Sequence, residues 1–181
     1  MRKIETAEEK DRKQKKKQTL IGGVMVLLLI MSTAGYAILS GTGNAETNIV
    51  EYNGFKFKSS GGYWILQSKQ LAFQYLPQEV ENVSIDGQFN LQQYNNKPLY
   101  FVNNNPASQE IIYNLQGVYL RWQEACLNEC DNLPIKNCSS NLIIFKESEE
   151  TRVYKDENCV YITGNYIKAT DAFIYKLLDI I

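Results

Sequence analysis

A run of 21 uncharged residues, Thr19 to Leu39, constrains this chain more than any other feature. As a helix that rises 1.5 Å per residue it would be roughly 31 Å long, close to the thickness of the hydrocarbon core of a bilayer. Its glycine, serine and threonine residues are tolerated in membrane helices. The sequence therefore predicts one transmembrane helix over residues 19–39, which would attach the chain to a lipid bilayer.

The charges that flank this segment predict its orientation. Residues 1–18 carry eight Lys or Arg against four Asp or Glu, and no further Lys or Arg occurs until Lys56. Four lysines stand just before the apolar run: Lys13, Lys15, Lys16 and Lys17. Because the cytoplasmic flanks of membrane helices are rich in Lys and Arg, we expect a basic cytoplasmic tail over residues 1–18. The chain would then be a single-pass protein of the cell membrane, with its C-terminal part outside.

A cleaved signal peptide is the alternative interpretation of the same segment. Gly35-Tyr36-Ala37 and Gly43-Asn44-Ala45 each place small residues where signal peptidase requires them. The apolar region of a signal peptide is usually about 7–15 residues long, shorter than this run. We therefore favour a retained anchor, although both interpretations export the rest of the chain.

The sequence after the anchor predicts a short linker, residues 40–48, and one extracytoplasmic domain, residues 49–181. The whole chain has a formal charge of −1 and the basic tail carries +4, so the remainder is acidic at −5. Binding to nucleic acid needs clustered cations, which excludes it as a function of this domain. The chain has no histidine, which removes the usual general base and the commonest zinc ligand.

Hydrophobic patterns predict an α+β fold in which helices cover one face of an antiparallel sheet. A β-meander is expected over residues 49–76, with a turn at Ser59–Gly62, and one helical turn at Pro77–Asn82. Further strands are expected at four places: Leu99–Val102, Leu142–Phe145, Arg152–Tyr154 and Cys159–Thr163. Apolar residues at helical spacing predict a long helix from Ala107 to Cys126, with Ser108 as its N-cap. A last helix is expected over residues 166–178.

The four cysteines, Cys126, Cys130, Cys138 and Cys159, predict two disulfides, because an exported domain meets an oxidising environment. We favour Cys130–Cys138 with Cys126–Cys159, and next Cys126–Cys130 with Cys138–Cys159. A four-thiolate zinc site and a redox-active pair are the alternatives. The irregular spacing and the lack of a CxxC motif count against both.

Two further patterns provide candidate sites. Asn82-Val83-Ser84 and Asn137-Cys138-Ser139 match the acceptor pattern for N-glycosylation. The densest group of acids, Glu79, Glu81 and Asp86, contains the residue type that glycosidases and calcium sites use. Solvated surface carboxylates are the simpler interpretation of these acids. No nucleotide-binding glycine motif and no HExxH occurs, so we predict no catalytic residue, no metal site and no cofactor.

The basic tail, the single apolar segment and the β-rich domain together resemble type IV pilin-like subunits in architecture. Residues 18–22 carry neither the small residue before the apolar run nor the early glutamate of that family, so no residue role is transferred. Three short segments resemble segments of uncharacterised small archaeal membrane-anchored proteins: Tyr52–Phe55, Pro77–Asn82 and Cys159–Gly164. This second resemblance implies no known activity.

The sequence as a whole predicts a membrane-anchored binding module rather than an enzyme. Its expected partners are the bilayer and a protein of the membrane or envelope. A carboxylate-based hydrolase that acts on envelope polymers is one alternative, and a pilin-like filament or secretion subunit is another.

Overall fold

The structure is a computed structural model that describes residues 12, 15–29, 31 and 48–181. The chain divides into two compact units, residues 1–46 and 47–181. In the first unit, residues 15–29 and 31 are helical and the side chains of Lys15, Lys16 and Lys17 are exposed. Among the described residues, no helix has both the length and the hydropathy that crossing a membrane requires. Lys13, the C-terminal part of the predicted anchor (residues 30 and 32–39) and most of the predicted linker lie outside the described residues.

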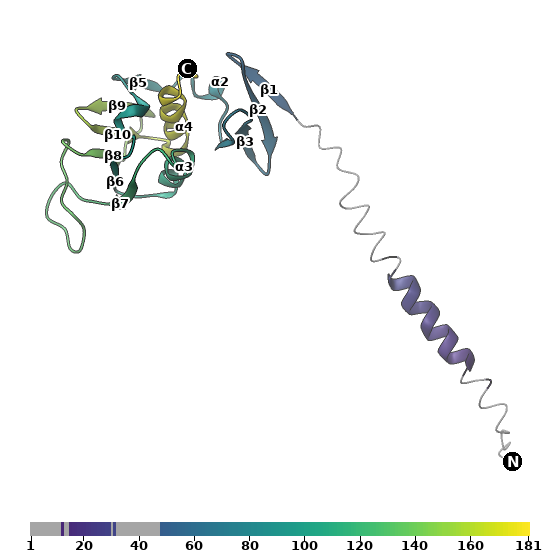
Figure 1. Cartoon of the computed structure of the whole chain (residues 1–181). Helices are drawn as coiled ribbons and strands as arrows, with labels where there is room; N and C mark the ends of the chain where they lie inside the picture. Colours follow the sequence, from purple (N-terminus) through teal and green to yellow (C-terminus); the bar gives the residue numbers. More distant parts are fainter. Residues whose placement is uncertain (1–11, 13–14, 30, 32–47) are drawn as a thin grey trace. The chain divides into compact units, whose positions relative to one another are not determined.

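The second unit begins with a four-stranded antiparallel sheet, which confirms the predicted meander (Figure 1). Its strands follow one another in space as in the sequence: β1 Ile49–Tyr52, β2 Phe55–Ser60, β3 Tyr63–Leu66 and β4 Leu71–Phe73. Two-residue turns connect the first three strands, and both residues of each turn, Asn53-Gly54 and Gly61-Gly62, have positive φ. Turns of this conformation match the twist of the flanking strands, which explains the choice of Asn and Gly.

A second sheet has six strands in the order β5-β9-β10-β8-β6-β7. Their bounds are β5 Ser84–Asp86, β6 Pro98–Val102, β7 Arg121–Glu124, β8 Asn141–Lys146, β9 Arg152–Asp156 and β10 Cys159–Thr163. Only β9 and β10 pair in antiparallel fashion, while the other neighbours are parallel. The predicted α+β class is confirmed, but the single antiparallel sheet is wrong. The continuous burial of Asn141–Phe145 fits a central parallel strand that is covered on both faces.

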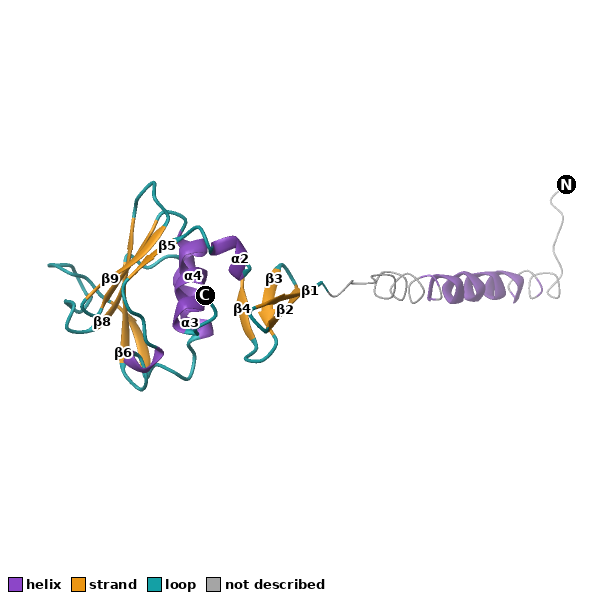
Figure 2. Cartoon of the chain, turned by 90° about the horizontal axis from the view of Figure 1, so that it is seen from above, coloured by secondary structure: helices purple, strands orange, loops and turns teal. Residues whose placement is uncertain are grey.

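The two longer helices of this unit, α3 Pro106–Asn114 and α4 Tyr166–Leu177, lie between the two sheets (Figure 2). One face of α4 packs on β9 and β10, and α3 packs against β4. The short helix α2 Pro77–Val80 also packs on α4, and a 3₁₀ turn, η1 Leu91–Gln93, precedes β6. The helices therefore form the middle layer of a three-layer domain.

The predicted helix from Ala107 to Cys126 is too long at its C-terminal end. Helix α3 ends at Asn114, Gly117 adopts a φ of +84°, and residues 121–124 form β7. A left-handed glycine ends a helix readily, and β7 gains a ladder of hydrogen bonds by pairing with β6. The N-cap is Asn105, whose side chain accepts a hydrogen bond from the Ala107 N–H, and not the predicted Ser108.

Aromatic side chains fill the space between the first sheet and α4. The rings of Phe73 and Tyr175 stack with centroids 4.3 Å apart, and Phe57 meets Tyr175 edge-on at 5.8 Å. The Tyr175 hydroxyl donates to the Tyr75 carbonyl at 2.7 Å, so its polar end is satisfied inside the core. A smaller cluster that includes Tyr100, Leu142 and Ile144 covers the other face of the second sheet.

Candidate functional site

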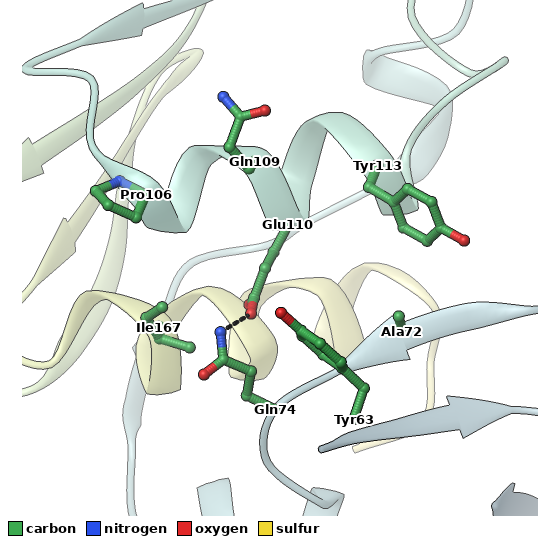
Figure 3. Close-up of a pocket in the computed structure, with 8 residues that line it drawn as sticks. All are labelled: Tyr63, Ala72, Gln74, Pro106, Gln109, Glu110, Tyr113 and Ile167. Carbon is green, nitrogen blue, oxygen red and sulfur yellow. Dashed lines mark hydrogen bonds between the residues drawn. The ribbon is translucent and has the colours of Figure 1, made fainter. Parts of the chain in front are cut away.

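A pocket of about 430 Å³ opens between α3 and the end of the first sheet (Figure 3). Helix α3 provides half of its wall, strands β3 and β4 and the chain after β4 provide most of the remainder, and α4 contributes one residue. The lining residues are Tyr63, Ala72, Gln74, Pro106, Gln109, Glu110, Tyr113 and Ile167. Its size falls within the usual range for a small-molecule site, about 300–1,000 Å³.

The polar centre of this pocket is the carboxyl group of Glu110. Glu110 lies on the buried face of α3 and is only 9% exposed. One of its oxygens, Oε1, accepts a hydrogen bond from the Gln74 side-chain amide at 2.7 Å. Figure 3 shows Glu110 extending from α3 towards Gln74, with the Tyr63 hydroxyl directed at the same carboxyl group.

A second carboxyl group, that of Asp171 on α4, is fully buried next to Glu110. Its Oδ2 accepts hydrogen bonds from the backbone N–H groups of Gln74 at 2.9 Å and Tyr75 at 2.8 Å. Asp171 thereby fixes the chain that leaves β4, and with it the position of the Gln74 side chain. Gln74 thus connects Glu110 and Asp171, and we call these two acids the acid pair.

The remaining oxygens of the acid pair, Glu110 Oε2 and Asp171 Oδ1, are buried and receive no hydrogen bond from any other described group. The pKa of Asp171 is raised to about 9, chiefly by burial and then by the hydrogen bond with Glu110 and the Glu110 charge, while the hydrogen bonds from the Tyr75 and Gln74 backbone lower it. Burial also raises the pKa of Glu110, while hydrogen bonds from Asp171 and Gln74 oppose that shift. Two carboxylates in contact resist simultaneous ionisation. At neutral pH the pair therefore holds a proton.

Neither Glu110 nor Asp171 was among the predicted candidates. The dense acids Glu79, Glu81 and Asp86, which were, do not converge. Glu79 accepts a hydrogen bond from the Leu76 N–H, Glu81 accepts from the Tyr52 hydroxyl, and Asp86 pairs with Arg152 on the surface. A usable signal was present: each acid of the pair occupies the apolar face of its own helix, next to Ile111 and Ile174 respectively.

The structure pairs all four cysteines, as Cys126–Cys130 and Cys138–Cys159. The two predicted disulfides are confirmed, but the favoured pairing is wrong and the second choice is right. Cys126 follows strand β7 and not a helix, so it is not directed at β10. Cys138 instead runs beside β10, where its carbonyl accepts a hydrogen bond from the Asn158 N–H at 3.2 Å. With both pairs bonded, no described cysteine remains as a free thiol that could bind zinc.

The two candidate glycosylation residues lie apart from the pocket. Asn82 is exposed in the turn after α2, and Asn137 is exposed in the loop before β8. The Asn137 side-chain oxygen accepts hydrogen bonds from the N–H and the hydroxyl of Ser139, at 3.2 and 2.6 Å. Modification of either residue stays a prediction.

The chain has no match among family models, curated proteins or solved structures.

Proposed function

We propose that this chain is a single-pass, membrane-anchored binding module that presents its α+β domain outside the cell membrane. The lysine cluster before the apolar segment 19–39 supports this orientation. The two disulfides also support it, because disulfides persist in oxidising compartments such as the extracellular space. A protein partner in the membrane or envelope belongs to the same proposal.

The observation that carries the binding function is the pocket with Glu110 at its polar centre. Apolar and aromatic walls with few polar groups are typical of sites that hold a small ligand. Tyr63 and Tyr113 are 44% and 57% exposed, a high fraction for large aromatic side chains. A ligand that covers these rings would recover apolar area, while Glu110 and Gln74 would determine its orientation.

Ligand-observed NMR on the full chain in detergent micelles tests this proposal. A library of small fragments should contain compounds that compete for one site. Tyr113→Ala should weaken them by about tenfold, because the loss of an aromatic contact costs about 1.4 kcal/mol. Trp122→Ala, a change of an exposed aromatic residue on β7, is the matched control and should leave binding unchanged. A library without hits, or hits that Tyr113→Ala leaves unchanged, would contradict the proposed site.

The acid pair favours one second candidate, the carboxylate-based hydrolase. A carboxyl group that stays protonated at neutral pH is what a general acid requires. Two features oppose this function. Asp171 is fully buried and does not line the pocket. The two carboxyl groups also act directly on each other's pKa, whereas glycosidase carboxyls stand about 5–9 Å apart around the substrate.

Incubation of the full chain with envelope polysaccharide tests the hydrolase, with release of reducing ends as the measurement. The binding proposal predicts no release above background. Release that Glu110→Gln abolishes, while Asp86→Asn retains it, would replace the binding module with an enzyme.

A further inference from the structure

The acid pair lacks a positive counter-charge. None of the eight residues that line the pocket is Lys or Arg. Asp171 and Glu110 obtain their hydrogen bonds from neutral amides, those of Gln74 and the Tyr75 backbone. Buried carboxylates normally pair with a cation, because an isolated buried charge is costly. The pair instead keeps a proton, so its environment favours added positive charge.

Glu110 also keeps unused capacity to accept hydrogen bonds. An ionised carboxylate offers about four lone-pair positions. Gln74 occupies one on Oε1, and Asp171 provides a further hydrogen bond to the carboxyl group. Glu110 is more than nine-tenths buried and is itself part of the pocket wall. Oε2 is itself buried, so a ligand in the pocket would use an acceptor position that Gln74 leaves free on Oε1.

The walls of the pocket suit an organic cation. The exposed rings of Tyr63, from β3, and Tyr113, from α3, both line the pocket (Figure 3). A cation over a tyrosine ring gains about 0.5–2 kcal/mol. Ala72, Pro106 and Ile167 provide apolar contact for a short hydrocarbon chain.

We propose that the pocket binds a small organic amine as its primary ammonium ion, which donates N–H hydrogen bonds to the Glu110 carboxylate and places its hydrocarbon chain between Tyr63 and Tyr113. This inference rests on the proposed binding function and names its ligand class. A primary ammonium ion fits better than a quaternary one, because only N–H groups can occupy the open acceptor positions. A neutral sugar could share the hydrogen bonds but would bring no counter-charge.

Proton linkage follows from this arrangement. A bound cation stabilises the ionised form of the pair, so amine binding should release protons and strengthen as the pH rises. Among the described residues, the titratable groups that line the pocket or interact with the pair also include Tyr175 on α4, Tyr63 on β3 and Tyr113 on α3, with Glu79 of α2 acting on Tyr175. Burial raises the pKa of Tyr175, so its hydroxyl stays neutral across the range from pH 5 to pH 8. The pH dependence in that range should therefore come from the acid pair.

Calorimetric titration of the full chain in detergent micelles tests the proposal, with n-butylammonium chloride as the probe. Butan-1-ol, which has the same chain without the charge, is the matched comparison, and D-glucose represents a saccharide. We expect n-butylammonium to bind at least about tenfold more tightly than butan-1-ol at pH 7.5, since charge-assisted hydrogen bonds are roughly twice as strong as neutral ones. Its affinity should rise by about tenfold between pH 5 and pH 8, in step with proton release measured in buffers of different ionisation enthalpy.

Three variants connect the effect to the acid pair. Glu110→Gln keeps an acceptor for the Gln74 amide and removes the charge from the wall, and should weaken n-butylammonium by at least about tenfold. Asp171→Asn keeps an acceptor for the two backbone N–H groups and donates to Glu110, so binding should persist without its pH dependence. Asp86→Asn removes one exposed charge elsewhere and should change neither. Far-UV circular dichroism checks that each variant is folded, and the comparison of amine with alcohol needs no variant.

The outcomes separate this inference from the function on which it rests. Equal affinity for n-butylammonium and butan-1-ol, preferred binding of glucose, or amine binding that survives Glu110→Gln would overturn the ammonium ligand but leave a binding pocket. Failure of all three probes and of the fragment library would overturn the pocket as a binding site.

Discussion

At the scale of single residues, Asp171 determines how this domain responds to pH. Its folded-state pKa of about 9 lies far above the usual value near 3.9 for an aspartic acid. Between these two values the folded state binds more protons than the unfolded state, so stability falls as the pH rises. The contribution of Asp171 is complete below about pH 4 and is lost progressively towards pH 9. Glu110, whose pKa is also raised, acts in the same direction.

Asp171→Asn should remove most of this dependence. The amide oxygen can still accept from the Gln74 and Tyr75 N–H groups, and the amide nitrogen can donate to Glu110. We expect the free energy of unfolding of the variant to exceed that of the wild type at pH 8 by roughly 1–3 kcal/mol, and the two proteins to converge near pH 5. Urea titrations at pH 5, 6.5 and 8 measure this difference. Asp86→Asn, at an exposed acid, should leave the pH profile as it is in the wild type.

At the scale of elements, the middle-layer helices complete the outer edge of strand β4. This strand ends the first sheet, and edge strands leave backbone groups without a ladder partner. The Asn114 side chain of α3 meets both backbone groups of Ala72: its oxygen accepts from the N–H at 2.9 Å and its nitrogen donates to the carbonyl at 2.7 Å. Asp171 of α4 accepts hydrogen bonds from the next two backbone N–H groups after β4. Side chains from two helices thus take the place of a fifth strand and hold one wall of the pocket.

Asn114→Ala tests this attachment. The substitution leaves the N–H and the carbonyl of Ala72 without partners at a half-buried site, and each orphaned group costs about 1–3 kcal/mol. We expect a loss of about 2–4 kcal/mol in the free energy of unfolding, measured by urea denaturation of the full chain. Gln116→Ala, a change of an exposed residue just after the same helix, should cost less than about 0.5 kcal/mol. Similar losses for both variants would show that Asn114 does not hold the edge of β4.

The two disulfides should contribute unequally to stability. Cys138–Cys159 spans 21 residues and lies over a buried cluster, whereas Cys126–Cys130 spans only 4 residues in an exposed loop. Chain-entropy estimates give about 3 kcal/mol for the longer loop and about 2 kcal/mol for the shorter one. Replacement of each pair by alanines, followed by thermal denaturation, should therefore lower Tm more for Cys138/Cys159. A larger loss of Tm for Cys126/Cys130 would indicate that the disulfide in the exposed loop contributes more to stability.

At the scale of the whole molecule, the sequence predicts the elements better than their assembly. Alternating apolar residues in Phe55–Lys58 and Leu71–Tyr75 predicted the meander correctly, and the predicted last helix agrees with α4. The predicted helix to Cys126 was too long because Trp122 continues the helical spacing by coincidence. The backbone there is determined instead by pairing with β6 and by the left-handed conformation of Gly117. Parallel pairing of β8 with β6 and β10 was missed, although the uninterrupted apolar run Leu142–Phe145 is typical of it.

The candidate site was not predictable from residue density. Attention to clustered acids led to surface carboxylates such as Asp86, whereas the acid pair joins residues 110 and 171 through tertiary packing. Each of these acids stands alone in the sequence, and only its place on an apolar helix face distinguishes it. That place carries information because an ionisable group there must lose its charge, pair with another group or bind a ligand.

We propose that the disulfide-braced domain is exported and remains attached to the membrane through residues 19–39. The most direct test is the intact mass of the protein extracted from native membranes, alkylated with and without prior reduction. We predict a full-length mass in the membrane fraction, with no alkylated thiol before reduction and four after it. Thiols that react before reduction would contradict export to an oxidising compartment. A soluble product that has lost about 37 or 45 residues would contradict the retained anchor, as a cleaved signal peptide predicts.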